Sequence, residues 1–191
     1  MAVDAGYKPE KTEFSEQEKQ ARHNEAQARR AEREKEAIAE QKLLDDLQNQ
    51  IANVSQTIWS SDFLSEEGES EYLERKQIRA FGARFVARSF MVVVDLNNNT
   101  AYAKYDRDEM LAITKLKKEK PDTVSFLWLK KNTLVLPMYD MAGKLWSLQF
   151  ILPNGTKLFI KRSKKSGTCF LVGTAPTKAR PVMIAEGFAT G

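Results

Sequence analysis

Residues 134–161, LVLPMYDMAGKLWSLQFILPNGTKLFIK, decide the fold. Apolar runs in this stretch predict three strands, at 133–139, 145–152 and 157–161. The connections at 140–144 and 153–156 contain aspartate, asparagine, proline and glycine, the residue types that form tight turns. Short turns of this kind join neighbouring antiparallel strands. The stretch therefore predicts an antiparallel sheet.

The segments on either side extend this sheet and add short helices. Further strands are predicted at 89–95, 100–105, 124–130, 168–172 and 182–185. The three asparagines at 97–99 favour a hairpin between the first two of these, because asparagine tolerates left-handed turn conformations. Short helices are predicted at 71–78, with its exit at Phe81-Gly82, and at 106–118. The fold class is therefore α+β, with a mostly antiparallel sheet.

A long helix is predicted from Ser15 to about Ile58, where the sequence contains no proline or glycine. Ser15 and Glu18 have the spacing of a capping box. An apolar stripe with helical spacing follows in its second half: Leu44, Leu47, Ile51, Val54 and Ile58. The stripe fits either docking onto the chain's own domain or helix-mediated self-association as a coiled coil. The first half offers mixed charges and alanine, so we expect it to be exposed to solvent.

Composition limits the class of protein. The chain has 191 residues, 42% of them hydrophobic and 29% charged, which suits one compact domain with an extended arm. It contains no apolar run long enough for a membrane helix and no signal sequence at its start, so we expect a cytoplasmic protein without membrane contact. A single cysteine, Cys169, and a single histidine, His23, are too few for a disulfide or a structural zinc site. We expect Cys169 to be a buried thiol and His23 to lie on the surface.

Positive charge is concentrated near the end of the chain. Residues 141–185 contain eight Lys or Arg and no Asp or Glu. Within them lies the predicted nucleic-acid-binding set: Lys157, Phe159, Lys161, Arg162, Lys164 and Lys165. Strand alternation would place Lys157, Phe159 and Lys161 on one face, where the ring could stack on a base between two lysines. The alternative is a half-exposed strand followed by a basic loop that prevents aggregation.

Other residues with binding potential receive a structural interpretation. A second lysine cluster, at 115–120, is offset by Glu119 and Asp122 and is a weaker candidate for nucleic-acid binding. Five large aromatic residues are expected in the core or at its rim rather than as base platforms: Trp59, Trp128, Trp146, Tyr72 and Tyr139.

Several segments resemble toprim-type DNA primases of plasmids and phages. They are residues 72–78, 134–151, 153–161, 165–167 and 182–191, and they occur in the family's order. The resemblance covers about residues 72–191 and implies the N-terminal portion of a primase, ending at the first toprim motif. Residues 85–131 contain additional strands that shorter members of the pattern lack, so no function is carried over to them.

The same resemblance implies a catalytic role for Glu186, which would stand at the end of the strand at 182–185. A carboxylate there could hold a divalent metal or accept a proton from the attacking hydroxyl. A toprim site also needs a later Asp-x-Asp pair, which this chain does not contain. The sequence Asp106-Arg107-Asp108 has that spelling but precedes Glu186, and we interpret it as a turn and helix cap. The alternative for Glu186 itself is an ordinary solvated turn.

These expectations combine into a domain plan and a function. We expect a helical arm at 1–58, a primase-like lobe at 59–181 and the start of a truncated toprim domain at 182–191. The lobe would position single-stranded DNA for RNA primer synthesis, with Mg²⁺ or Mn²⁺ and ribonucleotides bound only by the full-length enzyme. This piece would be inactive and would bind neither these metals nor zinc. The alternatives are a non-catalytic single-stranded-DNA-binding or replication accessory module, and a scaffold that acts through its long helix.

Overall fold

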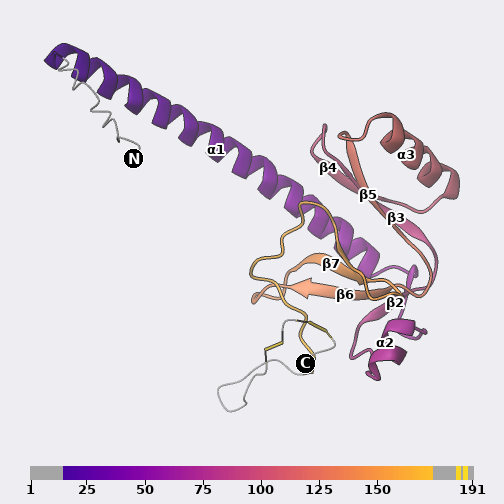
Figure 1. Cartoon of the computed structure of the whole chain (residues 1–191). Coiled ribbons are helices and arrows are strands. Elements are labelled where there is room, and N and C mark those ends of the chain that lie inside the picture. Colours follow the sequence, from indigo (N-terminus) through magenta and orange to yellow (C-terminus); the bar gives the residue numbers. More distant parts are fainter. Residues whose placement is uncertain (1–14, 174–183, 186, 189–191) are drawn as a thin grey trace, which may run out of the picture. The chain divides into compact units, whose positions relative to one another are not determined.

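The computed structural model describes residues 15–173, 184–185 and 187–188. The chain divides into two compact units, Met1–Lys42 and Leu43–Gly191. The helices are α1 (Glu16–Trp59), α2 (Glu71–Lys76) and α3 (Arg107–Glu119). The strands are β1 (Leu64–Ser65), β2 (Arg84–Val86), β3 (Phe90–Asp95), β4 (Thr100–Lys104), β5 (Val124–Leu129), β6 (Leu134–Tyr139), β7 (Leu145–Ile151) and β8 (Lys157–Phe159). This order of elements (Figure 1) confirms the predicted α+β class.

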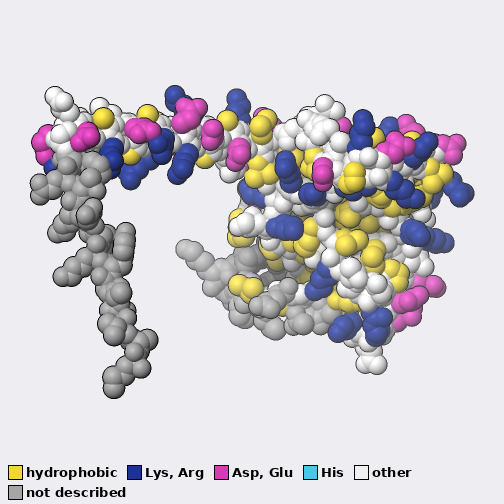
Figure 2. All heavy atoms as spheres, turned by 45° about the horizontal axis from the view of Figure 1, so that its top comes forward, with side chains coloured by type: hydrophobic (Ala, Val, Ile, Leu, Met, Phe, Trp, Pro, Cys, Tyr) yellow, Lys and Arg dark blue, Asp and Glu magenta, His cyan; other side chains and the backbone are white. Residues whose placement is uncertain are grey.

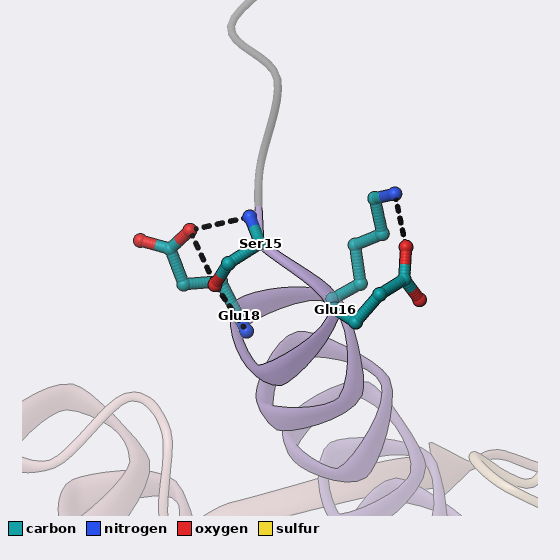
Figure 3. Close-up of polar contacts among 4 residues, drawn as sticks. Ser15, Glu16 and Glu18 are labelled. Atoms are coloured by element: carbon teal, nitrogen blue, oxygen red, sulfur yellow. Dashed lines mark hydrogen bonds and ion pairs between the residues drawn. The ribbon is translucent and has the colours of Figure 1, made fainter.

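Helix α1 begins at the predicted capping box (Figure 3). The backbone N–H and hydroxyl of Ser15 both donate to Oε2 of Glu18, at 2.8 and 3.0 Å, and the Glu18 N–H donates back to the hydroxyl at 3.3 Å. Residues 16–42 are exposed throughout, including His23, as predicted. Basic and acidic side chains alternate along this part of the helix (Figure 2). It is supported by ion pairs between neighbouring turns rather than by a core, as in the pair of Lys19 and Glu16 at 2.6 Å.

The second half of α1 carries the predicted apolar stripe. Leu47, Ile51 and Ile58 are fully buried, and they pack in one core cluster with residues from both sheets of the Leu43–Gly191 unit. Leu44 and Val54 are half-buried at the margin of the stripe. Of the two interpretations of the stripe, the structure therefore shows docking onto the chain's own core.

The larger sheet has five strands in the order β1-β2-β6-β7-β8, all antiparallel. Strand alternation gives it two buried faces. Val135, Leu148 and Phe150 join the core cluster that contains the α1 stripe. Leu134, Leu136 and Ile151 join a second cluster with Tyr72 and Leu73 of α2. The predicted central strands are thus confirmed, with ends that differ by one or two residues.

The smaller sheet, β4-β3-β5, is inserted between two neighbouring strands of the larger one. Strand β2 pairs directly with β6, so residues 87–133 leave the larger sheet and return to it. Hydrogen bonds between Val86 and residues 132–133 bring the two ends of this insertion together. Its hairpin and helix agree with the predictions: Asn99 has φ 51°, and the carboxylate of Asp106 accepts from two backbone N–H groups as the N-cap of α3. Among the described residues, no helix combines the length and apolar character that crossing a bilayer requires.

Some local predictions are wrong. Helix α2 ends at Lys76, two residues before the predicted end, because Gln77 adopts the left-handed conformation and caps it, so the exit is not at Phe81-Gly82. Residues 168–172 form only an isolated bridge between Cys169 and Tyr139 instead of a strand. Cys169 is exposed rather than buried, while its neighbour Phe170 packs against the α2 cluster. A single bridge orients one side chain inward and leaves the other in solvent.

Candidate nucleic-acid interface

The predicted basic set begins on β8, the edge strand of the larger sheet. Lys157 pairs with Ile151 and Phe159 pairs with Gln149, so these two residues share one face of the strand. Leu158 between them packs into the core cluster on the opposite face. Lys157 is exposed and Phe159 is half-buried. The expected alternation is therefore confirmed for these two residues.

Lys161 does not share that face, because β8 ends at Phe159, two residues earlier than predicted. Ile160 is 1% exposed and anchors the chain in the core just after the strand. The N–H of Ser163 then donates to the Ile160 carbonyl at 3.1 Å, and Arg162 has φ 60°, which together reverse the chain. Lys161 and Arg162 consequently stand exposed on a turn.

The next two lysines extend over two different aromatic rings. The Lys164 Nζ lies 3.9 Å from the centroid of the Trp146 ring, which belongs to β7. The Lys165 Nζ lies 4.9 Å from the centroid of the Phe159 ring, which belongs to β8. A single loop, residues 161–167, therefore brings positive charge to aromatic side chains of two neighbouring strands. We call this loop and the two rings the basic-aromatic surface.

The sequence predicts Trp146 in the core or at its rim, and its half-buried position agrees with that expectation. Its place in the basic-aromatic surface was not predicted. The Lys144 Nζ also lies over its ring, at 3.6 Å from the centroid, and donates to Oδ1 of Asn49 in α1 at 2.8 Å. The signal available in the sequence was Lys144 itself, two residues before a tryptophan in a region without acidic residues.

Asp140 fixes the edge of the Trp146 ring. The indole N–H donates to Oδ2 of Asp140 at 2.7 Å, and the backbone N–H groups of Ala142 and Lys144 donate to Oδ1, each at 2.9 Å. The indole hydrogen bond, followed by that of the Lys144 backbone, holds the pKa of Asp140 below its ordinary value. One charged carboxylate thus organises both the β6–β7 turn and the position of the ring.

The electrostatic surroundings favour an anion. Among the described residues, the recorded ion pairs involve none of the six predicted binding residues. The acidic group whose charge acts on Lys164 is that of Asp140, which precedes the acid-free segment. Apart from this influence of Asp140 on Lys164, the basic side chains of the set form no ion pair among the described residues and are suited to neutralise phosphates.

Glu186 lies outside the described residues, so its predicted role at a metal site stays a prediction. Of the strand predicted before it, the structure describes Ile184 and Ala185, which are exposed and belong to no strand, Ile184 being 95% exposed. Within the described part of the chain, no group of three or more histidine, cysteine, aspartate or glutamate side chains could hold a metal ion.

The remaining aromatic residues agree with their structural interpretation. Tyr72 is buried in the α2 cluster, Trp59 and Tyr139 pack against the core cluster of α1, and Trp128 packs against α3 and its sheet. The second lysine cluster lies on and just after α3, where Lys117 and Lys118 occupy the last turn.

Comparisons with known proteins give a partial match to DNA primases. No family model and no solved structure matches the chain. Two curated relatives, both DNA primase TraC of Escherichia coli, are 44% identical to it over 57 residues. The match covers 29% of this chain but only 5% and 4% of the two relatives, so the chain corresponds to a small part of their length. Over that stretch, the chain is similar to a DNA primase.

Proposed function

We propose that the Leu43–Gly191 unit binds single-stranded DNA template for a DNA primase, and that the basic-aromatic surface is where it does so. One observation carries the proposal: Lys164 and Lys165 lie over two aromatic rings in a segment without acidic residues. The similarity to DNA primases supports nucleic acid as the partner.

The expected binding mode follows from the groups present. Contacts of lysine and arginine with phosphates carry no sequence information, so affinity that rests on them depends on salt and hardly on sequence. The surface offers aromatic rings and ammonium groups rather than an array of amide side chains that would read base edges. We therefore expect weak binding with little sequence preference, which suits a protein that holds many different templates.

Catalysis is proposed only for the full-length protein. There, Glu186 would contribute to a site for Mg²⁺ or Mn²⁺ that also uses an Asp-x-Asp pair following it in the sequence, distinct from Asp106-Arg107-Asp108, and ribonucleotides would be polymerised into a primer. The described residues do not fit such a metal site by themselves. We accordingly propose that this chain alone holds template but does not synthesise primers.

Fluorescence anisotropy with a labelled single-stranded oligonucleotide at two salt concentrations tests the binding proposal. We expect measurable affinity at low salt that falls steeply as salt rises, because counterions are released when phosphates are neutralised. Oligonucleotides of different sequence serve as the control and should bind similarly. Salt-independent binding, or none at low salt, contradicts the proposal.

Primer synthesis by the full-length enzyme with Glu186→Gln tests the catalytic part. The amide keeps the shape of the side chain but can neither accept a proton nor balance metal charge, so synthesis should be abolished. DNA binding by the variant should persist. Primer synthesis near the wild-type rate would show that Glu186 is an ordinary turn residue.

A further inference from the structure

Trp146 occupies an unusual position on β7. Met138 pairs with Ser147 and Tyr139 pairs with Leu145, so Trp146 is the extra residue of a β-bulge between these pairs. A bulge re-aims one side chain out of the regular alternation of a strand. The side chain of Trp146 is half-buried, and its neighbours Leu145 and Ser147 are buried. The sheet is thus distorted at the one residue that carries the large ring.

The ring is also held in a fixed orientation. Asp140 binds its indole nitrogen at 2.7 Å, and the same carboxylate is fixed by two backbone N–H groups of the β6–β7 turn. A hydrogen bond from Lys144 to Asn49 also connects the β6–β7 turn to α1. A flat ring with a fixed edge loses little conformational entropy when a second flat group stacks on it.

A second ring lies beside the same loop. Phe159 is half-buried on β8, and Lys165 lies over it as Lys164 lies over Trp146. The two rings and Lys164 are half-buried and Lys165 is exposed, and a cation–π contact that is open to solvent is weaker than a desolvated one. Each of these two ammonium groups can therefore leave its ring when a phosphate and a base compete for the two partners. After such an exchange the lysine pairs with the phosphate and the base covers the ring.

We propose that Trp146 and Phe159 are base-stacking residues for single-stranded nucleic acid, and that Lys164 and Lys165 move from the rings to the adjoining phosphates on binding. The inference rests on the proposed function and identifies the parts of the nucleotide that this surface recognises. Bases in a duplex are already stacked on each other, so the rings select single strands over duplex. Because every base has an aromatic face, this selection is independent of sequence.

Two probes of equal length separate stacking from charge: oligothymidylate and an abasic oligonucleotide with the same backbone. The 191-residue chain should bind oligothymidylate more tightly than the abasic strand. In Trp146→Ala and Phe159→Ala, affinity for oligothymidylate should fall roughly five- to a hundredfold, while affinity for the abasic strand should stay nearly constant. Trp146→Phe is the matched control, since it keeps a ring and should retain most of the preference.

A spectroscopic measurement covers the case in which an alanine variant does not fold. Oligothymidylate should quench the tryptophan fluorescence of the wild type, and Trp146→Phe should remove most of the quenching because Trp59 and Trp128 pack against core clusters. Equal loss of affinity for both probes in Trp146→Ala, or quenching that persists in Trp146→Phe, overturns the stacking role while leaving the proposed function intact. Failure of the wild type to bind either probe overturns both.

Discussion

The two lysine-rich regions of the Leu43–Gly191 unit have similar compositions and different surroundings. In the basic-aromatic surface, Lys164 and Lys165 lie over aromatic rings and no acidic residue occurs in residues 141–185. On α3, Lys117 and Lys118 occupy the last turn, where the negative end of the helix dipole favours positive charge. The lysines of α3 therefore complement a helix dipole, whereas those near β8 lie over aromatic rings. Local surroundings, more than lysine count, distinguish a binding surface from a solvated helix.

The comparison assumes that both lysine-rich regions belong to one cooperatively folded unit. Ile51→Ala tests this assumption. Ile51 is 1% exposed in the core cluster that joins α1 to both sheets. Truncating a buried isoleucine costs about 2–5 kcal/mol, since the cavity adds to the lost apolar burial. The matched control is Ile38→Ala on the same helix, where the side chain is 63% exposed and the change should be small.

Urea unfolding followed by two probes, one in each sheet, measures the result. A single cooperative transition that shifts as a whole in Ile51→Ala is expected. Two transitions, with only one shifted, would show that the two lysine-rich regions rest on separately folding parts.

Removing the N-cap of α3 tests the comparison, because it destabilises the helix that carries the second lysine-rich region and leaves the basic-aromatic surface unchanged. Asp106 accepts backbone hydrogen bonds from Asp108 and Glu109 at 2.9 and 3.1 Å. Asp106→Ala should therefore lower the free energy of unfolding by about 0.5–2 kcal/mol. Asp108→Ala is a control that removes first-turn charge but no cap, and it should cost less.

Single-stranded DNA affinity of the same two variants should be unchanged under conditions where they remain folded. A loss of affinity in Asp106→Ala would assign a binding role to α3 and abolish the distinction between the two regions.

The smallest expected effect concerns Asp140 and pH. Its pKa is lowered in the folded protein, chiefly by the Trp146 indole, so the folded state favours the charged carboxylate. The resulting stability is complete above the ordinary value of 3.8 and is lost as the pH falls through the lowered pKa. Asp140→Asn should be slightly less stable at neutral pH and should lose less stability on acidification.

Thermal melts of wild type and Asp140→Asn from pH 6 downward measure this difference. Identical acid dependence in the two proteins would show that Asp140 does not hold Trp146 in solution. The Trp146 ring would then not be held in one orientation, and this difference between the basic-aromatic surface and the lysines of α3 would be lost.

Most of the fold could be predicted because its signals are local. The capping box of Ser15 and Glu18, the Asn97–Asn99 turn and the N-cap Asp106 each act within a few residues. The stripe on α1 was visible as a spacing, but its partner was not. Spacing shows which face of a helix is apolar, whereas tertiary packing decides whether the chain's own core or another copy covers it.

The missed features depend on contacts between distant residues. The bulge at Trp146 adds one residue to β7, which a two-residue alternation cannot reveal. The early end of β8 comes from the turn that Ile160 and Ser163 form after the strand. Cys169 was expected in the core because its neighbours are apolar, yet only one bridge holds this segment and its thiol faces solvent. The basic run at residues 157–165 is visible in the sequence, whereas the second ring beside it, Trp146, depends on the fold.

The dependence of single-stranded DNA affinity on salt, measured for two matched variants, tests the central claim most directly. One variant replaces four residues of the basic-aromatic surface by glutamine: Lys161, Arg162, Lys164 and Lys165. The other replaces the four lysines at 115, 117, 118 and 120. We predict that the first variant loses most of its affinity and much of the slope of log affinity against log salt, because each neutralised phosphate contact contributes about one unit or less to that slope. The second variant should keep both. Equal losses in the two variants, or a loss only in the second, would contradict the account.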